Sequence, residues 1–333
     1  MRIIIDAFGG DNAPLEMIKG AVEALQYGEQ IALCGDEAEI KKCAEQNNID
    51  ISKIEIVPAE AVISPEDEAR DVVKAKRNSS MGVGLDELAS GRADAFVSAG
   101  PTGALLMGGT MIVKRIGGVK RPALCAVAPG TNPTLIIDCG ANAECRPEML
   151  VQFAVMGTEY MRGLMGVENP RVGLANNGAE ECKGTELQIE AYKLLSQTEG
   201  INFVGNIEGR GVLLGECDVL VCDGFTGNII TKTIEGCASA LFGRMKEVFY
   251  SSLATKLAAA MLKPGLKSMK DSLDYKKYGG APIIGLKKPV IKAHGSSNSE
   301  AIKNAVRQAI LWSNAGVNER IEAACSRKGG AEE

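Results

Sequence analysis

The stretch Gly215-Glu-Cys-Asp-Val-Leu-Val-Cys-Asp-Gly-Phe-Thr-Gly-Asn228 predicts a strand, a glycine turn and a helix in succession. Residues 217–222 form a short apolar run rich in valine, which is typical of a strand buried on both faces. Gly224 and Gly227 bracket the turn, where the backbone must pass close to a neighbour, and we expect a helix from about Asn228. The first amides of such a helix lack partners, so this junction predicts a site for a small anion.

An earlier stretch repeats this pattern position by position: Gly91-Arg-Ala-Asp-Ala-Phe-Val-Ser-Ala-Gly-Pro-Thr-Gly-Ala104. Matched positions lie 124 residues apart: Gly91, Asp94, Gly100, Thr102 and Gly103 precede Gly215, Asp218, Gly224, Thr226 and Gly227. We expect two strand ends that face one crevice, as at a switch point of a parallel sheet. The alternative is that strand–turn–helix units simply look alike, and the repeat alone names no substrate.

The composition indicates a globular α/β protein. A length of 333 residues allows one large domain or two smaller ones, and 45% apolar with 24% charged residues is ordinary for a soluble chain. The net charge of −5 argues against nucleic acid as a partner. Ten cysteines, with no C-x-x-C pair and no recognisable secretory signal, predict free thiols in a reducing compartment and no zinc site. No apolar run reaches the roughly 20 residues of a membrane-spanning helix.

Polar residues and glycines also follow the first predicted strand, over residues 1–6. Four of them lie at or just after its carboxyl end: Asp6, Gly9, Gly10 and Asp11. Ligands bind at such strand ends in open α/β sheets. The alternative is that Asp11 or Asn12 only caps the helix predicted over 15–27. No G-x-G-x-x-G follows this strand, which disfavours a dinucleotide site.

Three later strand-to-helix junctions carry further polar groups. These groups are Asn142, Glu144 and Arg146 after one strand, Lys183 after the next, and Glu208 with Arg210 after a third. The loop 177–184 resembles a phosphate-binding P-loop, but its last glycine and lysine are reversed, so we reject a nucleoside triphosphatase. A lysine at a glycine turn before a helix still suits a phosphate or a developing oxyanion. The alternative is that Thr185 caps the helix and leaves Lys183 in solvent.

Residues 236–277 interrupt the α/β rhythm with a long helical segment. Its apolar side chains recur at helical spacing, which predicts either an arm for dimerisation or an interfacial helix on a membrane. The candidate membrane contacts are Leu253, Leu257 and Met261. Residues 263–292 hold eight lysines and two aspartates, which favours an acidic protein partner or an anionic lipid surface.

The last part of the chain returns to the α/β pattern. We expect a turn-rich link over 279–285, a strand over 289–293, a helix over 301–315 and a disordered tail from 326. Ser297 and Glu300 have capping-box spacing. The only histidine, His294, does not by itself indicate a Ser-His-Asp triad. It could still act as a general base or position the substrate.

Eight motifs occur in one order over nearly the whole chain. They are Asp6-Ala-Phe-Gly-Gly-Asp-Asn-Ala-Pro14, Ser98-Ala-Gly-Pro-Thr-Gly-Ala104, Ala141-Asn-Ala-Glu-Cys-Arg-Pro-Glu148, Lys183-Gly184, Gly205-Asn-Ile-Glu-Gly-Arg210, Cys222-Asp-Gly-Phe-Thr-Gly-Asn228, Tyr278-Gly-Gly-Ala-Pro282 and His294-Gly-Ser-Ser-Asn298. With them the chain closely resembles the bacterial phosphate acyltransferases, which make acyl phosphate from acyl-(acyl-carrier-protein) at the start of phospholipid synthesis. It departs from that pattern at Asn12, Pro101 and Ala179, which leaves the roles of those positions open.

The resemblance implies a three-layer α/β/α fold with a mostly parallel sheet, like that of phosphotransacetylases and the isocitrate dehydrogenase group. It implies a homodimer with one catalytic domain over 1–325, into which a helical arm, 236–277, is inserted. It also implies a cytoplasmic enzyme that docks on the inner face of the cell membrane, needs no metal or nucleotide cofactor, and supplies a glycerol-3-phosphate acyltransferase.

In the implied reaction, inorganic phosphate attacks a thioester and acyl carrier protein leaves. We assign Lys183 and Asn228 to hold phosphate and the developing oxyanion, with Asp223 and His294 orienting the reacting groups. The amides around Gly103 and Gly227 would cradle phosphate. The other candidate binding residues are Asp6, Gly9, Gly10, Asp11, Ser98, Gly100, Thr102, Asn142, Glu208, Arg210, Gly224, Thr226 and Ser296.

Three rival interpretations stay open. A short-chain phosphotransacetylase that uses coenzyme A would share the fold and the chemistry. A nicotinamide-dependent dehydrogenase would need paired metal-binding aspartates and a nucleotide loop, neither of which we find. A non-catalytic membrane scaffold would bind lipid without consuming a thioester.

Overall fold

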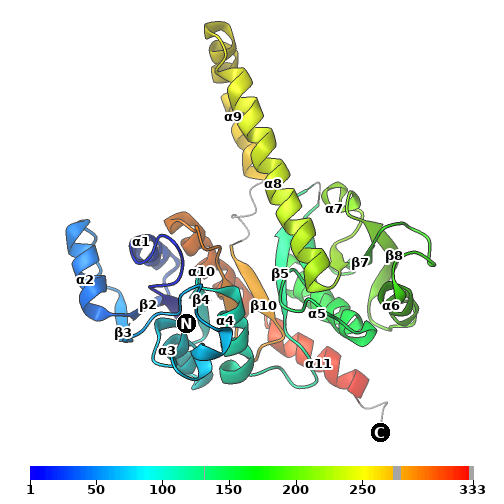
Figure 1. Ribbon diagram of the computed structural model, residues 1–333, viewed down its shortest axis with the longest axis horizontal. Helices are drawn as coiled ribbons and strands as arrows, with labels where there is room; N and C mark the ends of the chain where they lie inside the picture. Colours follow the sequence, from blue (N-terminus) through cyan, green and yellow to red (C-terminus); the bar gives the residue numbers. More distant parts are fainter. Residues whose placement is uncertain (131, 273–278, 330–333) are drawn as a thin grey trace.

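The computed structural model describes residues 1–130, 132–272 and 279–329, and its centre is one large sheet flanked by helices (Figure 1). The strands lie in the order β3-β2-β1-β4-β11-β10-β5-β6-β9-β7-β8. Their bounds are β1 Arg2–Asp6, β2 Gln30–Gly35, β3 Glu55–Pro58, β4 Ala95–Ser98, β5 Ala123–Ala128, β6 Thr134–Ile137, β7 Arg171–Asn176, β8 Asn202–Glu208, β9 Val219–Val221, β10 Ala281–Ile284 and β11 Val290–Lys292. The predicted mostly parallel α/β sheet is confirmed.

Helices cover both faces of the sheet. Their bounds are α1 Leu15–Ala24, α2 Glu37–Gln46, α3 Ser80–Ala89, α4 Thr102–Gly108, α5 Pro147–Met165, α6 Glu186–Ser196, α7 Gly211–Leu214, α8 Gly224–Phe249, α9 Leu253–Ser272, α10 Ser299–Asn314 and α11 Val317–Gly329. Shorter helical turns are η1 Leu25–Tyr27, η2 Ala69–Val73 and η3 Gly109–Val113. Alternate residues of a strand point to opposite faces, so Ile3 and Ile5 join a core with α1, α5 and α10, whereas Ile4 joins one with α3 and α4.

The two halves of the sheet run in opposite directions. Strand β4 is parallel to β11, but the contacts β11–β10, β10–β5 and β5–β6 are all antiparallel. Strand β9 is parallel to β6 and therefore antiparallel to β4. The expected switch point of a parallel sheet is therefore wrong for the two repeats, because three reversals lie between β4 and β9 and these strands run in opposite directions.

Four local expectations differ from the structure. Residues 281–284 form β10 rather than part of a link, because Ile283 and Ile284 are buried and pair with β5. Helix α8 begins at Gly224 instead of Asn228, since the Asp223 side chain caps it. Helix α10 is capped by Asn298 rather than by Ser297. Helix α11 continues through 326–329, which were expected to be disordered, and 330–333 lie outside the described residues.

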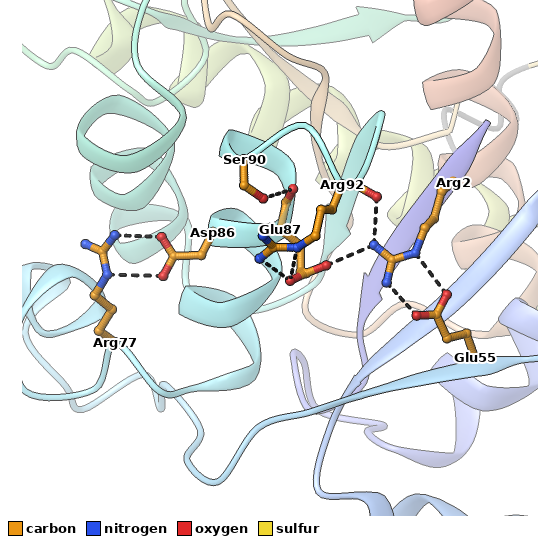
Figure 2. Close-up of polar contacts among 7 residues, drawn as sticks. All are labelled: Arg2, Glu55, Arg77, Asp86, Glu87, Ser90 and Arg92. Carbon is orange, nitrogen blue, oxygen red and sulfur yellow. Dashed lines mark hydrogen bonds and ion pairs between the residues drawn. The ribbon is translucent and has the colours of Figure 1, made fainter.

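A polar network ties the amino ends of the first strands to α3. Figure 2 shows Arg2 of β1 between two carboxylates, Glu55 of β3 at 2.7 Å and Glu87 of α3 at 3.0 Å. Glu87 also binds Arg92 at 2.6 Å. These contacts join β1, β3 and α3 at the edge opposite to the carboxyl ends of β1 and β4, which leaves those ends open for a site.

A helical arm projects from the body (Figure 1). It was predicted over 236–277, of which 273–277 lie outside the described residues. Helix α8 leaves the sheet over β5 and β6, and α9 packs against it beyond the body. In the part of the chain that the structure describes, no helix is both long and apolar enough to cross a membrane.

Candidate active site

A cavity of about 860 Å³ lies between the sheet and helix α8. Its walls come from the carboxyl ends of β4 and β11, one face of β5, and one side of α8. The sequence candidates that line it are Thr102, Asn228, His294 and Ser296. The two repeats therefore do meet at one cavity, because α8 crosses the sheet and brings Asn228 toward the end of β4.

The carboxyl ends of β1, β4 and β11 form one wall of packed loops. Ser98 donates its hydroxyl to the Asp6 carboxylate at 2.7 Å, and the Gly100 amide donates to the Ser98 hydroxyl at 3.0 Å. A side chain at Gly9 would lie 2.6 Å from the Gly100 nitrogen, so only glycine fits there. Burial raises the pKa of Asp6, while hydrogen bonds from serine hydroxyls oppose that shift. Asp6, Gly9, Ser98 and Gly100 thus shape the wall, and the cavity does not reach them.

The loop after β11 lies over this wall and carries His294. The Asp11 amide donates to the Gly295 carbonyl at 2.8 Å, which joins the loops after β1 and β11. Gly10 has a φ of 97°, in the left-handed region, and a side chain there would lie 2.8 Å from the same carbonyl. His294 Nδ1 lies 2.9 Å from the Ser296 hydroxyl. His294 and Ser296 are both exposed at the cavity mouth.

Helix α8 supplies the opposite wall and gives the cavity two chemical characters. Asn228, Thr231 and Lys232 line it near the start of the helix, and they are polar. Ile234, Ala238 and Phe242 line it farther along the helix, and the polar residues Glu235 and Ser239 lie between them. Leu124, Ala126 and Ile136 of β5 and β6 face them. The cavity therefore has a polar end and a mainly apolar length.

Lys292, at the end of β11, also lines the cavity, and sequence reasoning did not select it. Its residue is only 9% exposed. Burial lowers the pKa of Lys292 to about 8, against the opposing effect of Asp6 and Asp11. The prediction that the lysines of 263–292 contact an acidic protein partner or an anionic lipid surface is wrong for Lys292, because this residue is buried. The sequence signal for its burial was its position at the end of the apolar strand Val290–Lys292.

The glycines after β9 have a structural use. The Gly224 amide donates to the Asn142 carbonyl at 2.7 Å, and the Gly227 amide donates to the Asp223 carbonyl at 3.0 Å. A side chain at Gly227 would collide with the Asp138 carbonyl oxygen. The expected phosphate cradle at Gly227 is therefore not formed here, because its amide is already used inside α8.

Two other sequence candidates act as braces at the same junction. The Asp223 carboxylate accepts the Thr226 amide at 2.9 Å and the Thr226 hydroxyl at 2.8 Å, which caps α8. Asn142 donates its side-chain amide to Pro122 O at 2.9 Å and to Asp138 at 2.8 Å. None of these groups lines the cavity.

Gly103 is exposed in the first turn of α4 and does not line the cavity either.

Lys183 does not share the cavity with Asn228, contrary to expectation. The Lys183 carbonyl accepts the Asn176 side chain at 3.0 Å, and Thr185 with Gln188 forms a capping box on α6. Lys183 is exposed, as the alternative interpretation had it. Its loop nevertheless leaves the same sheet edge as the start of α8, because β7 and β9 are parallel neighbours.

Glu208 ends β8, one of the two edge strands of the sheet, and Arg210 follows it by two residues. They form an ion pair with each other at 2.6 Å, and the Arg210 side chain is 81% exposed. Neither residue lines the cavity. Within the described residues, no group of three or more His, Cys, Asp or Glu side chains is arranged to hold a metal ion.

Comparison with known proteins places this geometry in a family. A family model described as "Fatty acid synthesis protein" matches residues 1–320. The chain is 49% identical over 327 residues to the phosphate acyltransferase of Brevibacillus brevis, covering 97% of this chain and 96% of that protein. It is 47% identical over 313 residues to that of Bacillus subtilis, covering 93% of each. The chain belongs to the phosphate acyltransferase family.

Solved structures support the fold that the family resemblance implied. EutD phosphotransacetylase from Staphylococcus aureus matches with a TM-score of 0.56 and 18% identity, covering 95% of this chain and 94% of that one. A phosphotransacetylase from Streptococcus pyogenes matches with a TM-score of 0.59 and 16% identity over the same shares. At such low identity these likenesses show the fold alone, and they confirm the phosphotransacetylase-like architecture of this phosphate acyltransferase family member.

Proposed function

We propose that this protein transfers a long-chain fatty acyl group from acyl-(acyl-carrier-protein) to inorganic phosphate and yields acyl phosphate for phospholipid synthesis. Its membership of the phosphate acyltransferase family supports the reaction class. The single structural observation that carries the proposal is the cavity with a polar end and a long apolar wall. An acyl phosphate synthase needs both regions, because a charged nucleophile must meet a carbonyl at the head of a lipid chain.

The apolar wall fits the acyl chain. The apolar α8 residues that line the cavity run from Ile234 to Phe242. This corresponds to about 12 Å along the axis, at about 1.5 Å per residue. Burying an acyl chain along such a wall is favourable by about 0.8 kcal/mol for each methylene group removed from water. A site of this length supports a long-chain substrate over the short acyl groups of the coenzyme A alternative.

The polar end fits the reacting groups. Phosphate is itself the nucleophile, so the reaction needs no covalent enzyme intermediate. The protein has to position the two substrates and stabilise the charge that develops between them. Asn228 would donate to phosphate or to the thioester oxyanion, while Thr102, His294 and Ser296 surround the reacting atoms. Lys183 remains a candidate from the neighbouring strand end, provided that the loop 177–184 moves toward Asn228 during turnover.

The cellular setting is part of the same proposal. The family resemblance implies that the protein is a homodimer and that acyl carrier protein delivers its substrate. It also implies that a glycerol-3-phosphate acyltransferase uses its product. Exposed apolar residues on the arm support a cytoplasmic protein that attaches peripherally to the inner face of the membrane: Leu257 is 70% exposed and Met261 is 84% exposed. The Leu253 side chain lies outside the described residues.

The direct test is incubation with palmitoyl-(acyl-carrier-protein), with and without inorganic phosphate. We expect thioester loss and acyl phosphate formation only when phosphate is present. Acetyl- and butyryl-coenzyme A serve as competitors. Preferential use of either one would replace the proposal with a short-chain phosphotransacetylase, and liposome binding without thioester loss would indicate a scaffold.

A further inference from the structure

We infer that Lys292 is the cation that binds inorganic phosphate inside the cavity, donating a hydrogen bond from its ammonium group to the phosphate anion. This inference rests on the proposed function and names a residue that the sequence motifs did not select. Lys292 follows the apolar strand residues Val290 and Ile291, which are fully buried. Lys292 itself lines the cavity.

The hydrogen-bond count leaves one donor for a ligand. A lysine ammonium has three N–H donors. Two acceptors contact Nζ: the Ala99 carbonyl oxygen at 3.2 Å and the Ala293 carbonyl oxygen. In the described part of the chain, Lys292 forms no ion pair with a carboxylate, whereas Lys232 across the cavity is paired with Glu235 at 2.8 Å. Because Lys292 also lines the cavity, its third donor can serve a ligand bound there.

The surroundings hold this ammonium in place. Strand pairing sets Lys292 opposite Ser98 of β4 and opposite Ala281 of β10. A side chain at Gly280 would lie 2.5 Å from the Lys292 carbonyl oxygen, so β10 approaches closely only because glycine is there. A buried charge is costly unless it is compensated, and such groups concentrate at functional sites. The carbonyls of Ala99 and Ala293 compensate it partly, and an anion would complete the compensation.

The charged groups around Lys292 make its phosphate affinity depend on pH. Asp6 on β1 and Asp11 on the following loop favour the protonated lysine, while Lys232 on α8 disfavours it. His294 follows two residues later on the same segment. Because the pKa of Lys292 is about 8, the ammonium is present below that pH and is lost above it. Phosphate binding should therefore weaken as pH rises from 7 to 9.5.

The first test compares Lys292→Met with the wild type and with Lys42→Gln, at an exposed lysine on α2. We expect Lys292→Met to raise the KM for phosphate by about tenfold to a hundredfold, the usual worth of a hydrogen bond to a charged group. The KM for palmitoyl-(acyl-carrier-protein) should change less than about twofold, and Lys42→Gln should match the wild type. A wild-type phosphate KM in Lys292→Met would overturn the inference.

The second test measures phosphate binding without turnover. Inorganic phosphate should raise the Tm of the wild type and of Lys42→Gln, because a ligand that binds only the folded state stabilises it. It should not raise the Tm of Lys292→Met. If the wild type makes no acyl phosphate but shows this Lys292-dependent shift, the proposed function fails and the inference stands. An equal shift in all three proteins would refute the inference alone.

A third measurement needs no variant and decides the matter if Lys292→Met does not fold. The wild-type phosphate KM is followed between pH 7 and 9.5. We expect it to rise above pH 8, toward about tenfold per unit as the ammonium is lost. A flat profile would contradict a role for this lysine in binding phosphate.

Discussion

At the scale of single residues, two buried aspartates have related tasks at the ends of strands. Asp6, the last residue of β1, accepts the Ser98 hydroxyl. Asp138, after β6, accepts the amides of Leu124, Gly140, Ala141 and Asn142, together with the Asn142 side chain. Burial raises the pKa of Asp138, and these donors act in the opposite direction. Both carboxylates hold loops beside the cavity and do not themselves line it.

Replacing Asp138 with alanine should destabilise the fold. The change leaves several buried N–H groups without an acceptor, and each unsatisfied group costs about 1–3 kcal/mol. We expect a loss of about 3 kcal/mol or more in the free energy of unfolding, measured by urea denaturation. The control is Asp36→Ala, which removes an exposed cap of α2 that accepts one amide and costs about 1 kcal/mol. Equal losses in the two variants would contradict the bracing role.

Asn228 is the residue whose catalytic assignment the cavity favours most. Loss of one preorganised oxyanion donor lowers turnover by about 10²–10³-fold, so we expect a fall of this size in kcat for Asn228→Ala. Acyl phosphate formation is the measurement. Thr233→Ala is the control, since Thr233 is exposed on α8 and does not line the cavity. Wild-type turnover in Asn228→Ala would remove the assignment.

The same fall is predicted for Lys183→Ala, by a different route. Because Lys183 lies outside the cavity, its loop must move during turnover for the ammonium to reach the reacting atoms. An unchanged kcat in Lys183→Ala, with an unchanged Tm, would mean that this lysine is only an exposed neighbour of the α6 cap.

At the scale of secondary-structure elements, α8 is the element that creates the site. Its cap at Asp223 fixes where it begins, and Gly224 and Gly227 let it pack against the loop after β6. It then crosses β6 and β5 and continues into the arm (Figure 1). One helix therefore connects the polar end of the cavity, the apolar wall and the projecting segment.

Filling the apolar wall of α8 should shorten the accepted acyl chain. Ala238 lines the cavity, so Ala238→Phe places a large ring where the chain would lie. We expect kcat/KM to fall about tenfold or more for palmitoyl-(acyl-carrier-protein), with little change for the octanoyl substrate. Ala240→Phe is the matched control, because Ala240 is exposed on the same helix and does not line the cavity. An equal fall for both chain lengths would argue against an acyl site here.

At the scale of the whole molecule, the arm and the body have different surfaces. The body buries its apolar residues in two layers on either side of the sheet. The arm instead exposes Val248, Tyr250, Leu257, Met261 and Leu262, each by more than half. Apolar side chains gathered on a projecting segment indicate a surface that is covered in use. The proposed membrane contact makes a lipid surface the occupant to test.

The double variant Leu257→Glu with Met261→Glu should release the protein from vesicles of anionic phospholipid, because carboxylates oppose both burial and the lipid charge. Sedimentation with the vesicles measures binding, and size-exclusion chromatography checks that the oligomeric state is unchanged. Leu311→Glu, at a leucine 50% exposed on α10, is the control. Undiminished sedimentation of the double variant would show that these arm residues do not contact lipid.

The sequence alone determined the α/β alternation, most element positions and the family. These depend on local signals: apolar periodicity, turn glycines and motifs such as Cys222-Asp-Gly-Phe-Thr-Gly-Asn228. Local signals also identified Thr102, Asn228, His294 and Ser296, which the structure brings to one cavity. Their catalytic roles stay predictions.

Only the tertiary structure decided strand direction and which polar groups were free to act. The reversals at β10 and β5 come from long-range pairing that no local pattern encodes. The same packing uses Asp223 and Gly227 inside the fold, leaves Lys183 exposed, and buries Lys292 at the cavity. A side chain's chemistry is read from its type, but its availability depends on neighbours that are distant in the chain.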